Sequence, residues 1–195
     1  MTNSASSSYA TPKEWDSASL RRAAKILTAL KTRRLELYKP YPKQAEFHRL
    51  GIDHRERLLL AGNQLGKTLC AANEGAYHAT GLYPDWWQGR RFAGPTRAWV
   101  ANTNNETTRD APQRLLMGEP KDWGTGTIPK SMIARDPVMS RGFPDLIDTV
   151  QIKHVSGGIS TIQFKAYDQG RKKFQGGTLH WEWLDEEPPF DVYTE

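Results

Sequence analysis

Two short stretches of the 195-residue chain hold the side-chain types that phosphate chemistry uses. The first covers residues 61–68, ends in Gly-Lys-Thr and leads into a helix-like stretch. Backbone N–H groups in such a loop, together with the N-terminus of the following helix, favour bound phosphates. In this pattern Lys67 reaches the β- and γ-phosphates and the Thr68 hydroxyl holds Mg²⁺. We therefore predict a nucleotide-binding loop, for which the alternative is a glycine-rich turn with a surface lysine. The predicted loop residues are Ala61, Gly62, Asn63, Gln64, Leu65, Gly66, Lys67 and Thr68.

The second stretch is the acidic run at residues 185–187, which follows a β-prone segment and precedes Pro188. In a nucleotide hydrolase the first acid, Asp185, would hold Mg²⁺ through water. The second acid, Glu186, would orient or deprotonate the attacking water. An acidic turn at a strand end is the plain alternative. The Gly-Lys-Thr loop in the same domain favours the hydrolase interpretation, with Glu186 and Lys67 as catalytic residues.

A glutamine upstream of the loop is a candidate for base recognition. Gln44 lies on a predicted short helix over residues 43–48. Its amide both donates and accepts, so it can pair with the edge of adenine, and Tyr41 or Phe47 can stack on the base. The alternative is a surface glutamine near core aromatics.

The hydrophobic pattern predicts an α/β scaffold for these residues. Residues 58–60 form a short apolar run that predicts a buried strand ahead of the loop, and residues 69–76 predict the helix after it. Two alternating segments joined by Ser-Gly-Gly predict a β-hairpin. The remaining expectations are a strand at 98–101, a helix that opens at 104–106 and includes 114–117, a long irregular insertion at 118–149, and hairpin strands at 150–155 and 160–165.

Composition places the chain among ordinary globular proteins, with 37% hydrophobic and 25% charged residues. No apolar run is long enough for a membrane span, and the N-terminus lacks the pattern of a secretory signal. The single cysteine, Cys70, cannot form an intrachain disulfide, and we interpret it as a core residue.

The net charge of +5 is concentrated at the N-terminus. Residues 1–40 hold 8 Lys/Arg and 3 Asp/Glu, whereas residues 41–195 hold 19 of each. Residues 1–15 are Ser-rich and are expected to be disordered. Residues 16–40 are expected to form a basic amphipathic helix, capped by Ser17 or Ser19 and running through Leu37. Such a helix either packs on the domain or contacts DNA phosphates, and we favour packing.

Several motifs together resemble one protein family. They are residues 42–47, 61–68, 167–171 and 174–177, and the segment that ends in Asp-Glu-Glu-Pro-Pro at 185–189. The chain resembles, over residues 38–195, the large terminase subunit of tailed bacteriophages, closest to short-tailed phages that package by the headful. This resemblance implies a P-loop NTPase of the ASCE, RecA-like type with a parallel-sheet core and a β-hairpin insertion.

The resemblance also implies a function, cofactors and partners. It implies an ATPase that uses ATP and Mg²⁺ to drive viral DNA into procapsids, with Gln44 in the adenine motif, residues 61–68 as Walker A, and Asp185 and Glu186 as Walker B. The implied partners are double-stranded viral DNA, the small terminase subunit, the portal or procapsid, and further copies in a ring. The implied location is the host bacterial cytoplasm, with no membrane partner.

Three departures from the family pattern stand out. Many members carry an arginine in the loop, where this chain has Asn63, and another near Gln175. The transition-state arginine is therefore unassigned, with Arg171 a weak candidate. Only nine residues follow Glu186, so the coupling motif and the nuclease domain of the family are absent from this sequence. The alternatives are a prophage remnant without activity and a helicase-like P-loop ATPase.

The expected domain at 41–195 is thus an ATPase domain that is incomplete at its C-terminal side. In the ASCE arrangement a further strand lies between the loop strand and the strand that carries the acids. We expect the segments at 58–60 and 179–184 to lose that neighbour. They would then either stay unpaired or close up and pair with each other.

Overall fold

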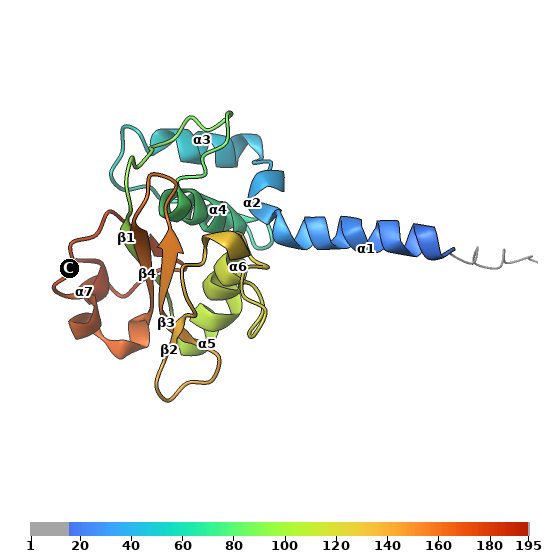
Figure 1. Ribbon diagram of the computed structural model, residues 1–195. Coiled ribbons are helices and arrows are strands. Elements are labelled where there is room, and N and C mark those ends of the chain that lie inside the picture. The colour runs from blue at the N-terminus through green and yellow to red at the C-terminus, as the bar shows by residue number, and fades with distance from the viewer. Residues whose placement is uncertain (1–15, 195) are drawn as a thin grey trace, which may run out of the picture.

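The protein is described here by a computed structural model, which covers residues 16–194. It is an α/β protein in which helices flank a single mixed sheet (Figure 1). No helix in this range is long and apolar enough to cross a membrane. The predicted disordered leader at 1–15 lies outside the described residues. The helices are α1 (Ser17–Thr32), α2 (Arg34–Leu37), α3 (Pro42–Leu50), α4 (Lys67–Thr80), α5 (Asn105–Thr108), α6 (Arg114–Met117) and α7 (Phe190–Tyr193), with short helical turns η1 (Arg109–Gln113), η2 (Lys130–Met132), η3 (Tyr167–Gln169) and η4 (Arg171–Phe174).

The sheet has the strand order β2-β3-β4-β1-β5. Its strands are β1 (Arg97–Asn102), β2 (Val138–Met139), β3 (Ile147–Lys153), β4 (Ile159–Ala166) and β5 (Trp181–Leu184). β1 runs parallel to β4 on one side and to β5 on the other, so these three strands end at the same edge. β3 pairs antiparallel with β4, which confirms the predicted hairpin and its turn at 156–158. The predicted α/β class is therefore confirmed, as are the strand at 98–101 and the helix from 105 to 117.

The central strand β1 buries both of its faces because its side chains alternate between two hydrophobic clusters. Ala98 and Val100 pack into the larger cluster, which includes residues of α4 and α6. Trp99 and Ala101 pack into a smaller cluster with residues of η3, η4 and α7. Layers thus cover both faces of the sheet and leave its C-terminal edge to the loops that follow β1, β4 and β5.

The basic N-terminal helix differs from the expectation. Asp16, and not a serine, accepts the backbone N–H of Ser19 and caps α1, and the helix is interrupted at Arg33 before α2. A carboxylate at this position also favours the positive end of the helix dipole. No residue of α1 is buried, and α1 projects from the rest of the molecule (Figure 1). The expectation that the helix over residues 16–40 packs on the domain is therefore wrong for α1, whereas Leu35 of α2 is buried in the larger hydrophobic cluster.

The strand predicted at residues 58–60 is absent. The segment is irregular, and Leu58 and Leu60 are 78% and 82% exposed. A strand needs a neighbour for its backbone N–H and C=O groups, and no described segment pairs with this one. β5 also lacks a strand partner on one side, because within residues 16–194 it pairs only with β1. The segments at 58–60 and 179–184 do not pair with each other, which is the first of the two expected outcomes.

Candidate functional site

The loop at residues 61–66 leads directly into α4, as predicted. Gly66 is the N-cap of α4 and has φ +78°, in the left-handed region that favours glycine. Gln64 also has a positive φ, of 61°. Alternation between left- and right-handed backbone turns successive N–H groups toward the same side of a loop, which creates a concavity suited to anions. The first turn of α4 adds its own unpaired N–H groups beside this loop.

Lys67 closes over this loop. Its Nζ donates to the carbonyl oxygens of Ala61 at 2.8 Å and Gly62 at 3.1 Å. The ammonium therefore lies on the loop itself, where it is available to a phosphate that displaces these carbonyl contacts. Thr68 follows at the second position of α4 and borders a cavity of about 390 Å³, which is also lined by Arg34, Asp110, Ala111, Arg114, Leu115, Gly118, Glu119 and Thr125.

Gln44 is attached to the loop from the side. Its Nε2 donates to the carbonyl oxygen of Gly66 at 3.0 Å, and its Oε1 accepts the N–H of Tyr41 at 2.9 Å. The second contact closes the first turn of α3, which begins with Pro42 at a position where a missing N–H costs nothing. The side chain is only 5% exposed. The structure thus joins Gln44 to the predicted loop, although the two are 22 residues apart.

Asp185 lies just past the C-terminal end of β5. Its backbone N–H donates to the carbonyl of Ala101 at 2.8 Å, so it continues the pairing of β5 with β1. Its carboxylate accepts from Asn102 Nδ2 at 3.0 Å and from Trp183 Nε1 at 3.3 Å. Asn102 is the last residue of β1. The ends of two parallel strands thus hold the carboxylate in place.

The backbone after Asp185 is held in an uncommon conformation. Glu186 has φ +60°, which costs a residue with a Cβ about 1–2 kcal/mol. The hydroxyl of Tyr167 donates to the carbonyl of Asp185 at 2.9 Å and lies 3.4 Å from that of Glu186. Tyr167 is buried and begins η3, directly after β4. The turn that presents the Glu186 side chain to solvent is therefore held by a hydroxyl that follows β4, on the far side of β1 from β5.

The electrostatics connect the acid pair with the loop. Burial is the main reason that the pKa of Asp185 is raised to about 6, while the hydrogen bond from Trp183 lowers it. The negative charge of Glu186 raises this pKa further, and the positive charge of Lys67 lowers it. Lys67 therefore acts on a carboxylate 118 positions further along the chain.

The predicted magnesium ligands can be tested against this geometry. Among residues 16–194 no group of three or more His, Cys, Asp or Glu side chains is arranged to hold a metal ion. Asp185 and Glu186 do not line the cavity that Thr68 borders. Mg²⁺ nevertheless needs only one or two protein oxygens when phosphates and waters complete its shell. Thr68 and Asp185 offer such oxygens, and a partly buried carboxylate with a raised pKa gains from a nearby cation.

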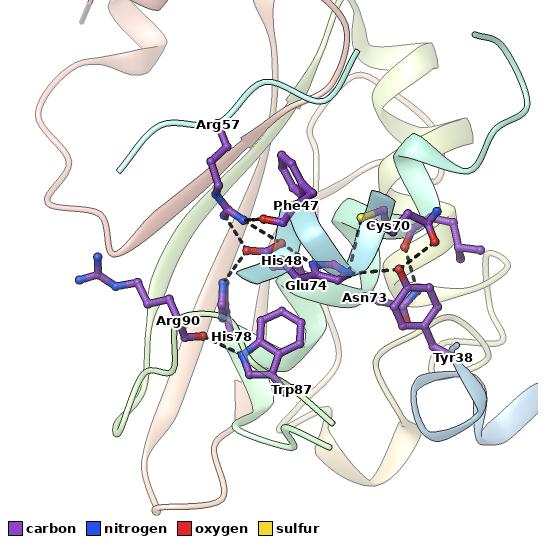
Figure 2. Close-up of polar contacts among 12 residues, drawn as sticks. Tyr38, Phe47, His48, Arg57, Cys70, Asn73, Glu74, His78, Trp87 and Arg90 are labelled. Carbon is purple, nitrogen blue, oxygen red and sulfur yellow. Dashed lines mark hydrogen bonds and ion pairs between the residues drawn. The ribbon is translucent and has the colours of Figure 1, made fainter. Parts of the chain in front are cut away.

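Behind the loop, α3 and α4 are joined by a buried polar cluster that the sequence did not reveal (Figure 2). Its centre is Glu74 on α4, whose carboxylate contacts His48 Nδ1 at 2.8 Å, Arg57 Nη2 at 2.6 Å and His78 Nε2 at 3.3 Å. Burial by itself would raise the pKa of Glu74, but these three partners together hold it well below its usual range. Glu74 is therefore a buried carboxylate ion.

Cys70 lies in this cluster and is a core residue, as predicted. Its Sγ is 3.5 Å from His48 Nε2, while His48 Nδ1 faces Glu74, an order that resembles a Cys-His-acid triad. Cys70 is, however, fully buried, and burial raises its pKa to about 12. A thiol that is neutral and closed to solvent is not a nucleophile.

Three residues of the site escaped the sequence analysis: Tyr167, Asn102 and Glu74. Tyr167 opens a motif that the family resemblance had already marked, and Asn102 ends a predicted strand. Parallel neighbouring strands bring such end positions together, so strand order was the missing information. Glu74 gave only one signal, an acid on the apolar side of a predicted helix.

Fold and site together define an α/β protein whose polar side chains gather where parallel strands end, beside a glycine loop that starts a helix. The comparisons with known proteins specify the family. Residues 58–195 match the family described as "terminase large subunit, T4likevirus-type, N-terminal", and the chain belongs to this family.

The similarity extends to a curated relative. The large terminase subunit of Salmonella phage P22 is 42% identical over 178 residues, which cover 81% of this chain. This chain spans only about a third, 36%, of the length of that relative. No solved structure gives a significant match. The recognition made from the motifs is confirmed, and family membership decides against the helicase-like alternative.

Proposed function

We propose that the chain is the ATP-binding and ATP-hydrolysing part of a phage terminase that packages viral DNA. The observation that supports it best is the loop that ends at Gly66, the N-cap of α4, with Lys67 Nζ on the carbonyls of Ala61 and Gly62. A glycine loop at a helix N-terminus suits a triphosphate, and the acid pair at the end of β5 suits the activation of water. Under this proposal the fold is a P-loop NTPase of the ASCE type.

Each side chain then has a role in the proposed reaction. The N–H groups of residues 62–68 bind the phosphates, and Lys67 moves from the carbonyls of Ala61 and Gly62 to the β- and γ-phosphate oxygens. Thr68 and Asp185 hold Mg²⁺, which when bound neutralises charge on the phosphates. Glu186 takes a proton from the attacking water. Gln44 belongs to this site through its bond to Gly66.

The larger assembly is part of the same proposal. The relative is named a terminase large subunit, and we infer that this chain acts with double-stranded viral DNA, a small terminase subunit, and a portal or procapsid in the host bacterial cytoplasm. We infer that copies of the chain assemble in a ring, in which the arginine for the transition state remains unassigned. The basic side chains of α1 are suited to DNA phosphates.

Two variants test the chemistry. Lys67→Ala is expected to abolish Mg-ATP binding in calorimetry, while Lys25→Ala on the projecting α1 leaves it unchanged. Equal affinity for wild type and Lys67→Ala would refute the loop assignment. Glu186→Gln is expected to bind Mg-ATP but not to hydrolyse it, because an amide cannot take the proton. Binding without hydrolysis by the wild-type chain would instead favour the alternative of an inactive prophage remnant.

A further inference from the structure

We propose that Gln44 is a positioning residue for the phosphate loop, and that it does not read the adenine base. This inference concerns the proposed nucleotide site and therefore rests on that proposed function. It assigns base-independent binding to this part of the site: the triphosphate is recognised here and the base is not.

The acceptor oxygen of the Gln44 amide and one of its two N–H donors are already engaged within the protein. To read adenine, a glutamine must accept from the base with Oε1 and donate to it with Nε2. Oε1 has two lone pairs, and it already faces the N–H of Tyr41 at 2.9 Å and the hydroxyl of Tyr38 at 3.3 Å. Nε2 donates to Gly66. At 5% exposure, the side chain offers a base no free acceptor.

Gln44 holds a backbone group at the start of α4. The carbonyl of Gly66 also accepts the N–H of Cys70 at 2.9 Å, the first hydrogen bond of α4. Gly66 adopts φ +78°, and a Cβ there would lie 2.9 Å from Gln44 Nε2. Gln44 therefore fixes the hinge residue between loop and helix, immediately before Lys67. A shift of this carbonyl would turn the N–H groups that are aimed at the phosphates.

Gln44 is itself held in place by a buried chain of polar contacts. The hydroxyl of Tyr38 lies 3.1 Å from His48 Nε2, and His48 Nδ1 lies 2.8 Å from the carboxylate of Glu74. Arg57 anchors that carboxylate in turn (Figure 2). A buried chain of polar contacts thus leads from the middle of α4 through α3 to the first residue of the loop–helix junction. Rigid support of this kind suits a positioning residue, whereas a base reader must face an open cleft.

The test compares three probes: Mg-ATP, Mg-GTP and magnesium tripolyphosphate, which has no base. Gln44→Met removes the donor to Gly66, together with the acceptor for Tyr41 and Tyr38, and adds no charge. Gln44→Glu keeps oxygen acceptors but places a carboxyl group beside the phosphates, so the affinities are compared in Gln44→Met. We expect the affinity for all three probes to fall together, by about tenfold for the loss of the hydrogen bond to Gly66. Loss of ATP affinity alone, with tripolyphosphate unchanged, would overturn the proposal, as would no loss for any probe.

A second measurement does not depend on nucleotide binding. Amide hydrogen exchange over residues 66–70 is expected to quicken by about tenfold in Gln44→Glu and in the apolar variant Gln44→Met, which serves if the first folds poorly. Lys43→Ala, a change of an exposed neighbour on the same helix, is the control and should leave this exchange unchanged. If the wild type binds none of the probes, the proposed function fails, while unchanged exchange would refute the positioning role itself.

Discussion

Replacement of Arg57 by methionine tests how strongly the buried cluster holds α3 against α4. Arg57 donates to Glu74 at 2.6 and 3.3 Å and to the carbonyl of Phe47 at 2.7 Å, and its guanidinium lies over the Phe47 ring. Methionine keeps most of the apolar stem and removes the charge. The side chain of Glu74 is 7% exposed, so its carboxylate would lose its only permanently charged partner among the described residues in a poorly solvated place.

The expected magnitude follows from the remaining partners. Removing one partner of a buried ion pair costs about 3–5 kcal/mol. Glu74 keeps its contacts with His48 and His78, and the Arg57 side chain is 19% exposed, so the lower end applies. We expect a loss of about 3 kcal/mol in the free energy of unfolding. For a chain of this size that is a fall of about 6–12 °C in Tm.

The double variant Arg57→Met/Glu74→Gln makes the test specific. Glutamine still accepts from His48 but carries no charge, so the double variant should be more stable than Arg57→Met alone. Urea denaturation of the wild type, both single variants and the double variant yields the coupling free energy. A loss below about 0.5 kcal/mol for Arg57→Met, or strictly additive losses, would refute the reasoning.

Four further predictions concern the acid pair, the turn after it and Glu74. Tyr167→Phe should lower the free energy of unfolding by about 1–2 kcal/mol in urea denaturation, because the Asp185 carbonyl loses its buried donor. Because the folded pKa of Asp185 is raised to about 6, its contribution to stability is fully present at acidic pH and is lost as pH rises through about 6. Asp185→Asn should therefore abolish that part of the pH dependence in thermal melts, and an unchanged profile would contradict it. The lowered pKa of Glu74 has the opposite effect on stability. The contribution of Glu74 to the free energy of unfolding is present above the ordinary carboxyl pKa, near 4.5, and is lost as pH falls. Glu74→Gln should therefore flatten the acid side of the stability profile. Glu186→Gly should leave the protein as stable as wild type or about 1 kcal/mol more stable, because glycine relieves the left-handed backbone; a clear loss would show that the Glu186 side chain stabilises the turn.

Local patterns predicted most of the scaffold. The alternation at 150–155 and 160–165 around Ser-Gly-Gly predicted the hairpin, and the apolar run at 98–101 predicted the central strand. The segment at 58–60 shows the limit of this reasoning. Three leucines are compatible with a strand, but a strand forms only with a backbone partner, and that partner depends on tertiary arrangement.

The candidate site was predictable where a motif carries its own geometry. Residues 61–68 and Asp185 lie where the motifs placed them, on a loop before a helix and at a strand end. Glu74, Asn102 and Tyr167 could not be found this way, because each acts through a residue distant in sequence. The capping of α1 by Asp16 was missed for a simpler reason: aspartate caps as well as serine, and it stood one position earlier.

The single-sided pairing of β5 has a consequence for how this molecule meets other chains. Within residues 16–194 the side of β5 away from β1 has no strand partner, so its backbone N–H and C=O groups could pair with a strand of another chain without side-chain recognition. An added strand would take the next place in the sheet, roughly 4.8 Å from β5. If parallel to β5, it would end beside Asp185. A strand bound at that edge would fix the positions of Asp185 and Glu186, so binding at the edge would affect the chemistry at the site.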